Sequence, residues 1–433
     1  MFKKTIISML ILTAACSLSY AQPDLFGVDF NIMGTGARAR GMGGAFIGVA
    51  DDATAVGWNP AGIAQLDKME ASVVGLFNMQ KVTVDMTYAD YPEYNDSWDE
   101  SSSHIAPAFA SFIMPTKMAD KNLVFAVAYQ RMIDMGYVRK DEGEYYGLTD
   151  TLRYSYKTTA TGGLDAISPA VAIQLTPQIM VGAAGNILIN GYKTETNETY
   201  PDYTADYRNY TMESDLSGFN MNFGFLGTFN KINVGAMFRL PFTLTEEPSE
   251  SEEWDLTGSG WTNWDTTTGS YSETYSEVET TMPLMFGFGV ALKPTDKFTI
   301  AADFERRPYS SVEYSSEGYT EDAGFKDCNQ FRVGMEYIMS GTTAVFPIRL
   351  GFRTDPRVYT GWYGDGTDTS QVVGKVFTGG FGLVMGKLML DLAYEFTMAN
   401  HADVDIADPY IGQFTGKADE QTHNIMASAI IHF

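Results

Sequence analysis

Few residues of this chain have types and spacing that could do chemistry. It has four histidines, no His-x-x-x-His pair and no Gly-x-Ser-x-Gly motif, so neither a zinc-protease helix nor a serine-hydrolase elbow is predicted. His104 follows the run Ser101–Ser103, but a histidine at a loop mouth is more often solvated than catalytic. We therefore expect no catalytic residue, no cofactor and no metal site, and the chain is predicted not to be an enzyme.

Charged residues recur in three otherwise apolar segments near the end of the chain. A spacing of four residues places both charges on one face of a strand, opposite the apolar side chains. The pairs are Arg332 and Glu336, Arg349 and Arg353, and Asp391 and Glu395. On neighbouring antiparallel strands such charges can pair with one another, or an arginine among them can bind the carboxylate of a ligand. Arg38 and Arg40 are alternatives for that second role.

The N-terminus has the pattern of a secretory leader. Two lysines precede an apolar run, and Ser19–Ala21 offers small residues for cleavage, so residues 1–21 are predicted to be a signal peptide. Cys16 raises lipoprotein processing as an alternative, although plain cleavage fits the leader better. Cleavage leaves Cys328 as a lone cysteine, which excludes an internal disulfide.

The chain is strongly acidic. Its formal net charge is −25, and removal of the two leader lysines would make it −27. Such a charge repels nucleic acid, so no nucleic-acid partner is expected. Acidic residues are concentrated in two stretches without Lys or Arg, at 85–100 and 246–279. We interpret both as solvated loops, with divalent-cation binding, also at Asp365–Asp368, as the alternative.

Apolar residues alternate with small or polar ones, which predicts strands. Examples are Phe219–Phe225 and Leu388–Phe396, where one face is apolar and the other is not. The longest uncharged stretch, 166–191, contains two prolines and reads better as two strands split at Thr176–Gln178 than as a membrane helix. The leader, 25 Tyr, 27 Phe and the terminal aromatic Phe433 favour a transmembrane β-barrel over a soluble sandwich.

Connection lengths predict the number of strands. Bacterial barrels have short periplasmic turns, longer outer loops and an even strand count. Six short links are predicted at 115–121, 176–178, 230–231, 293–297, 340–344 and 386–387. Seven long polar links are predicted at 85–104, 137–163, 193–217, 246–280, 310–327, 354–371 and 400–421. Their alternation predicts about fourteen strands, with Tyr145–Lys157 as ordered loop and not an additional strand.

A glycine-rich segment, Gly36–Gly62, precedes the first strand. Gly34–Ala39 formally matches a dinucleotide-binding fingerprint, but no strand of a βαβ unit precedes it, so glycines packed inside a lumen are the better interpretation. Asp51 can cap a helical turn, and Asn59 before Pro60 predicts a second short helix. The expected hatch or gating residues are Gly41, Gly43, Gly44, Asp51, Asn59, Pro60, Ala61 and Gly62.

Together these features resemble the FadL-type outer-membrane transporters. The resemblance rests on Asn59–Ala61 in the hatch and on Pro294–Asp303, Phe331–Tyr337 and Ile348–Phe352 in the last third of the chain. It implies an all-β fold, a fourteen-stranded barrel in the bacterial outer membrane with a small plug. The predicted domains are the leader, a hatch over residues 22–69 and a barrel over residues 70–433.

The resemblance also implies a function. FadL-type barrels pass hydrophobic molecules, such as long-chain fatty acids or hydrocarbons, toward an opening in the wall, so passive, hatch-gated uptake is expected. The implied partners are a hydrophobic ligand, outer-membrane lipid and the barrel-assembly machinery, which would read Phe433. The alternative is a PorV-like role in protein secretion or assembly, with a secretion-system partner. An adhesin or structural barrel is a third possibility.

Overall fold

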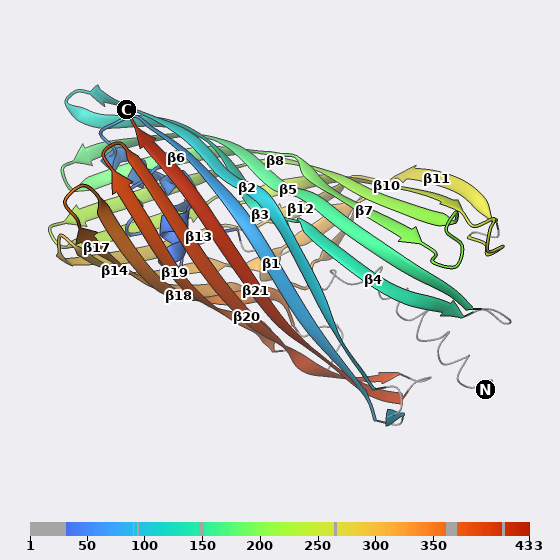
Figure 1. Ribbon diagram of the computed structural model, residues 1–433. Coiled ribbons are helices and arrows are strands. Elements are labelled where there is room, and N and C mark those ends of the chain that lie inside the picture. The colour runs from blue at the N-terminus through green and yellow to red at the C-terminus, as the bar shows by residue number, and fades with distance from the viewer. Residues whose placement is uncertain are drawn as a thin grey trace.

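The computed structural model describes residues 32–89, 91–92, 95–146, 151–263, 266–360, 370–408 and 412–433. The predicted leader and the first ten residues of the predicted hatch lie outside these residues, and so does Asp365–Asp368. The described chain is a long barrel whose short turns gather at one end, near the C-terminus (Figure 1). In the parts of the chain just given, no helix is long and apolar enough to cross a membrane.

Fourteen antiparallel strands form a closed ring, in agreement with the predicted count. The last strand closes the ring by pairing with the first, from Glu70↔His432 to Tyr88↔Phe414. The ring strands are β1 (Glu70–Tyr88), β2 (Asp96–Met118), β3 (Lys121–Asp134), β5 (Thr151–Thr176), β6 (Ile179–Ile189), β8 (Tyr207–Phe229), β9 (Ile232–Arg239), β13 (Met285–Thr295), β14 (Phe298–Arg307), β17 (Cys328–Ser340), β18 (Val345–Thr360), β19 (Gln371–Met385), β20 (Leu388–Asp408) and β21 (Gly412–His432). All six predicted short links join consecutive strands of this ring.

The predicted long loops are mostly strand, which corrects the sequence prediction. Seven further strands extend the rim opposite the short turns: β4 (Tyr137–Tyr146), β7 (Gly191–Thr199), β10 (Phe242–Asp255), β11 (Thr268–Thr274), β12 (Val278–Met282), β15 (Glu313–Ser316) and β16 (Tyr319–Asp322). Tyr145–Lys157, predicted as ordered loop, contributes to β4 and β5, with 147–150 outside the description. Pairing satisfies the backbone there, whereas polar residues on both faces hide the period-two pattern.

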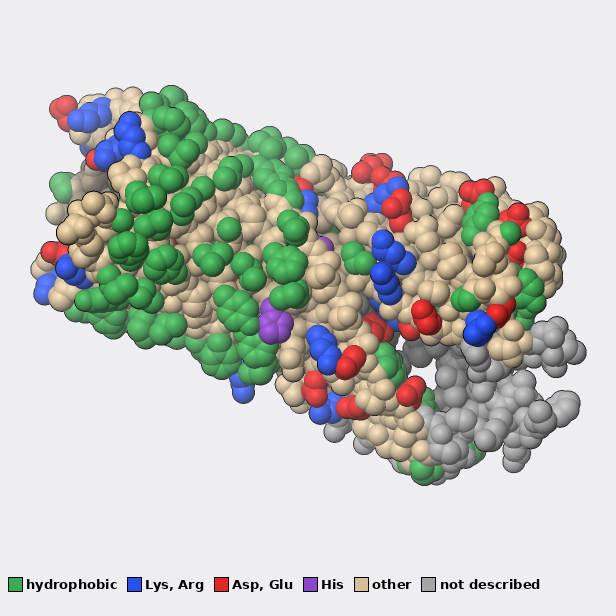
Figure 2. Space-filling view, in the orientation of Figure 1, with side chains coloured by type: hydrophobic (Ala, Val, Ile, Leu, Met, Phe, Trp, Pro, Cys, Tyr) green, Lys and Arg blue, Asp and Glu red, His purple; other side chains and the backbone are tan. Residues whose placement is uncertain are grey.

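Exposure alternates along the ring strands. In β20, Leu390, Leu392 and Tyr394 are exposed, whereas Asp391 and Glu395 are buried, as predicted. Figure 2 shows hydrophobic side chains covering the wall toward the short-turn end and charged side chains gathering over the rim. Apolar residues outside and charged residues inside are the arrangement of a membrane barrel, because lipid surrounds the wall.

The hatch, residues 32–69, contains three short helical segments before the first strand. They are α2 (Ala37–Gly41), α3 (Ala55–Trp58) and the 3-10 helix η1 (Pro60–Gln65), and a further 3-10 turn, η3 (Tyr309–Ser311), lies in the rim. Asn59 caps η1 by accepting a hydrogen bond from the Ala61 N–H at 3.2 Å, and Pro60 occupies the first turn, as predicted.

The predicted aspartate cap of the preceding helix takes a different form. Thr54, not Asp51, is the N-cap of α3, and its side chain makes no capping hydrogen bond. The Asp52 carboxylate instead accepts hydrogen bonds from the Thr54 N–H at 2.9 Å and the Thr54 hydroxyl at 2.6 Å. This local turn competes with a conventional cap and starts the helix later.

Candidate functional site

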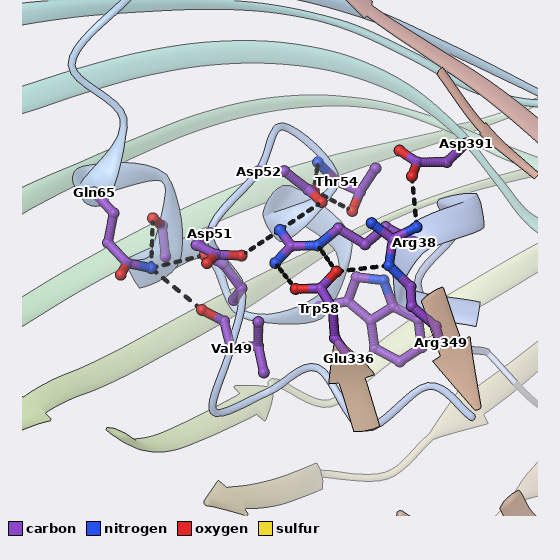
Figure 3. Close-up of polar contacts among 12 residues, drawn as sticks. Arg38, Val49, Asp51, Asp52, Thr54, Trp58, Gln65, Glu336, Arg349 and Asp391 are labelled. Atoms are coloured by element: carbon purple, nitrogen blue, oxygen red, sulfur yellow. Dashed lines mark hydrogen bonds and ion pairs between the residues drawn. The ribbon is translucent and has the colours of Figure 1, made fainter. Parts of the chain in front are cut away.

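The two hatch arginines reach wall carboxylates. Arg38 donates to both carboxylate oxygens of Glu336, at 3.0 and 2.9 Å, and to Asp51 at 2.6 Å (Figure 3). Arg40, two residues on, holds both oxygens of Glu395 at 2.8 and 2.6 Å. Burial alone would lower the pKa of Arg38, but Asp51 and Glu336 raise it well above its usual value, so the guanidinium remains charged.

The same wall carboxylates are also paired within the wall. Arg349 donates to Glu336 at 2.6 Å and to Asp391 at 2.5 Å, and Arg353 donates to Glu395 at 2.6 Å. The predicted inward charges therefore bond to one another across β17, β18 and β20. Each wall carboxylate that holds a hatch arginine also holds a wall arginine.

Arg332 lies in a second charged cluster. It bonds to Glu305 and Gln330 instead of Glu336, and its guanidinium lies 5.4 Å from the ring centroid of Trp58 in the hatch. Glu305 also accepts from Arg307 at 2.8 Å. In both Arg307 and Arg332, the terminal nitrogen Nη1 is buried without a hydrogen-bond partner. The cluster has more guanidinium groups than carboxylates to match them.

Arg239, in β9, completes this cluster and differs from every arginine predicted from the sequence. It is 2% exposed, and its hydrogen-bond partners are neutral groups: Asn222 Oδ1 at 3.2 Å, the Ile32 carbonyl at 3.4 Å and Met285 Sδ at 3.8 Å. Glu305 acts on Arg239 through its charge but makes no hydrogen bond to it, and Glu305 is itself hydrogen-bonded to Arg307 and Arg332. A buried charge without a hydrogen-bonded counter-ion is costly. Arg239 is therefore the described lumen arginine best placed to accept an anionic group from outside the chain.

Apolar side chains surround the rim side of Arg239. Met285 and Ile32, which both contact it, belong to one buried apolar cluster inside the barrel. The buried members are Ile32, Met132, Ile133, Leu164, Ala166, Leu188, Leu216, Phe242, Leu244, Met282, Met285, Tyr309, Val312, Cys328 and Val358. A porin lumen is polar and water-filled, whereas this part of the interior is apolar. Arg239 thus places a positive charge at one end of this apolar cluster.

The predicted Asn-Pro-Ala segment bridges the hatch and the wall. Asn59 Nδ2 donates to the Ile47 carbonyl at 2.9 Å and to the Phe225 carbonyl of β8 at 3.0 Å. Pro60 and Ala61 pack on Gly182 of β6, where a Cβ atom would meet the Pro60 carbonyl at 2.5 Å. The amide of Asn59 thereby fixes one hatch turn to the wall.

The hatch glycines occupy positions of close approach. Gly43 has a φ of 69°, and a Cβ there would meet backbone atoms of Phe352 and Val333 at 2.7 and 2.8 Å. The other three predicted glycines pack as closely: Gly41 against Gly380, Gly44 against Trp58 and Gly62 against the Ala50 carbonyl. A side chain at Gly41 or Gly43 would displace the hatch from the wall, and one at Gly44 or Gly62 would displace other parts of the hatch.

A neutral polar network lies where the pairing of β5 with β6 skips Ser168 and Pro169. Gln130 donates to the Ser168 hydroxyl at 2.8 Å, Ser168 donates to Asn186 at 2.7 Å, and Asn186 donates to Asn220 at 2.5 Å. Proline has no N–H to contribute to a ladder. On the outer face nearby, β5, β6 and β8 form a groove of about 400 Å³ lined by Val171, Ala172, Ile173, Val181, Gly182, Ala183, Phe223 and Gly224.

His104 is not solvated, contrary to the sequence prediction. Its Nε2 lies 2.5 Å from Asp134, and its side chain is 14% exposed. Of the serines before it, Ser102 accepts a hydrogen bond from the Val138 N–H instead of facing the histidine. Within the described ranges, no group of three or more His, Cys, Asp or Glu residues is placed to hold a metal ion.

Sequence reasoning missed Arg239, Arg307 and Gln330. It also assigned no role to Glu305. Arg239 is the last residue of a strand whose other inward positions, Asn233, Gly235 and Met237, are uncharged, so no neighbouring charge signalled it. One signal could have found it. Residues an even number of positions apart share a face of a strand, so Arg239 lies on the same inward face as Gly235.

The closed ring with an internal hatch has the fold of solved FadL-type barrels. A Pseudomonas aeruginosa FadL homologue matches with a TM-score of 0.61 and 13% identity, over 94% of this chain and 100% of that one. The P. putida toluene transporter TodX (TM-score 0.56, 14% identity, 93% and 99% coverage) and the Ralstonia pickettii toluene transporter TbuX (0.52, 15%, 93% and 100%) also match. At these identities the likeness concerns the fold.

The family follows from the sequence itself. The BamG family model matches residues 1–399, most of the chain, so the protein belongs to the BamG family. No curated protein matches this chain.

Proposed function

We propose that this protein takes up hydrophobic small molecules across the outer membrane by passive diffusion, and that the hatch gates their passage. The solved structures of similar fold include proteins described as toluene transporters. The apolar cluster supplies an interior that an apolar molecule can enter, and its three buried methionines are flexible enough to repack around a guest.

Arg239 is the observation that carries the proposal. It combines burial, a positive charge and neutral hydrogen-bond partners at the end of an apolar cluster. A molecule with an apolar chain and an anionic head, such as a long-chain fatty acid, satisfies both parts of this site at once. Arg38 and Arg40, which the sequence offers for the same role, already hold carboxylates and have a hatch-anchoring role in this proposal.

The hatch supplies the gate in this proposal. Its contacts with the wall are hydrogen bonds, ion pairs, close glycine packing and a shared apolar core, in which Ile63 of the hatch lies with Phe109 and Ile113 of β2. None of these contacts is covalent, so in this proposal the hatch shifts as a unit. Movement of Asn59 and Pro60 away from β6 and β8 would open the lumen beside the interrupted β5–β6 pairing. The outer groove at this place gives a departing molecule an apolar route into the lipid.

Native mass spectrometry of protein released gently from outer membranes tests the proposal. We expect a bound amphiphile that added dodecanoate displaces and that 1-dodecanol, which lacks the negative charge, displaces less well. Failure of every amphiphile to bind would refute the uptake proposal.

Membership of the BamG family favours a second candidate function, an assembly role beside the barrel-assembly machinery at the outer membrane. The same spectra separate the two. A polypeptide retained in stoichiometric amount, with no small ligand, would favour assembly. A PorV-like secretion partner would also appear as a retained polypeptide, and its identity would distinguish the two pathways.

A further inference from the structure

The outermost edge of the rim is an unpaired strand. β11 bonds to β10 along one side, from Ser249↔Thr274 to Asp255↔Thr268, and among the described residues no strand pairs with its other side. Figure 1 places β11 at the far end of the rim from the C-terminus and the short turns. Since short turns are periplasmic in outer-membrane barrels, this edge faces the outside of the cell.

The ladder identifies the backbone groups that point away from β10. The Thr267 carbonyl accepts a hydrogen bond from the Leu256 N–H, just after β10, at 2.7 Å. The Tyr275 N–H donates to the Pro248 carbonyl of β10 at 2.9 Å. Only alternate residues of an antiparallel pair exchange such bonds, so residues 269, 271 and 273 face β10. The N–H and C=O groups of Ser270 and Ser272 therefore point outward, and both side chains are exposed.

β11 lacks the features that usually protect an edge strand. Its seven residues include no lysine and no proline, and its pairing contains no bulge. Other rim edges carry such features: β16 has four residues, the start of β4 lies against β2 through a hydrogen bond from the Val138 N–H to Ser102 at 2.9 Å, and the rim part of β20 has an irregularity between His401 and Val404. β11 is thus the rim edge best able to accept another strand.

The surroundings of this edge are acidic. Between residues 246 and 279 there are ten Asp or Glu and no Lys or Arg. Burial opposes ionisation of Glu250, but hydrogen bonds from three tyrosine hydroxyls lower its pKa below the usual value, so it is charged at neutral pH. The donors are Tyr210, Tyr271 and Tyr275.

We propose that β11 binds an extended, cationic segment of another protein by strand addition. The outward N–H and C=O groups of Ser270 and Ser272 would hold its backbone, and the acidic side chains would select lysine or arginine. A second copy of this chain is disfavoured, because pairing two β11 strands would bring two acidic hairpins together. The inference does not depend on the lumen or on hydrophobic uptake.

Binding of a nine-residue peptide of alternating lysine and valine to the full-length protein in nanodiscs tests the proposal. We expect saturable binding, and no binding of the matching peptide of glutamate and valine. Ser270→Pro with Ser272→Pro removes the two outward N–H groups without touching the ladder and should weaken binding about ten-fold or more. The control, Ser270→Thr with Ser272→Thr, keeps both N–H groups and should bind as the parent does.

Hydrogen exchange of β10 must stay unchanged in the proline variant, which shows that the hairpin is intact. Equal binding to the proline and threonine variants would overturn strand addition, leaving only charge attraction. Absence of binding to the parent protein would overturn the proposal entirely. A dimer that the prolines abolish would assign the edge to a second copy. None of these results bears on ligand binding at Arg239.

Discussion

Replacing Arg239 by methionine separates ligand binding from stability. Methionine has a similar length and would lie among the apolar neighbours of Arg239, including Met285. No described carboxylate hydrogen-bonds to Arg239, and Glu305, which acts on it through its charge, keeps Arg307 and Arg332, so the loss of Arg239 strands no buried negative charge. Removing an unmatched buried charge should therefore leave the free energy of unfolding unchanged or raise it by up to about 2 kcal/mol.

The effect of Arg239→Met on ligand affinity should have the opposite sign. A hydrogen bond to a charged group contributes about 1.5–3 kcal/mol, so the Kd for dodecanoate should rise about 10- to 150-fold. The Kd for 1-dodecanol should change little, because that ligand gains nothing from the charge. Isothermal titration calorimetry and urea unfolding in the same detergent measure both quantities.

Two results would refute this reasoning. If the variant weakens dodecanoate and 1-dodecanol equally, Arg239 shapes the interior but does not bind the head group. If the variant unfolds more than about 2 kcal/mol more easily, the arginine is a structural element whose neutral partners suffice to stabilise it.

Three further predictions follow from the hatch and the wall. Deleting residues 36–62 should leave a heat-modifiable barrel on gels but change hydrophobic uptake, and unaltered uptake would show that the hatch gates nothing. Arg349→Met should destabilise the barrel by about 3–5 kcal/mol in urea unfolding, since it leaves Glu336 and Asp391 short of a partner. Burial raises the pKa of Asp52. The stability that Asp52 gives the docked hatch is therefore fully present below the pKa of an unfolded aspartate, about 3.9, and is lost as the pH rises through its higher pKa in the folded protein. Protease protection of the hatch should therefore decrease as the pH rises above about 4, and Asp52→Asn should flatten this dependence.

The barrel could be predicted because its signals are local. Period two along Leu388–Phe396 and the tight turns between strands each depend on a few adjacent residues, and the ring follows from their alternation. The rim could not be predicted in the same way. Its strands, such as β7 and β10, face water on both sides, so pairing holds them without an apolar period.

The site shows the same limit. The spacing of Arg349 and Arg353 revealed that both face the lumen, but not which carboxylate each one holds. Such partners come from strands and a hatch far apart in the sequence, as with Arg40 and Glu395. Arg239 was missed because its defining property is the absence of a hydrogen-bonded carboxylate, and that depends on every strand around it.

The distribution of ion pairs determines what hatch movement would cost. If the hatch leaves, Glu336 keeps Arg349 and Glu395 keeps Arg353, so the wall retains no unmatched carboxylate at these two positions. Arg38 would carry Asp51 with it, since both belong to the hatch. Because the charges on either side remain largely matched after separation, undocking avoids most of the penalty of breaking buried pairs. The exceptions are Arg40, whose partner among the described residues is Glu395, and Asp303 of β14, whose carboxylate accepts from the Phe46 and Ile47 N–H groups of the hatch at 2.7 and 2.8 Å. These contacts set the main electrostatic resistance to opening.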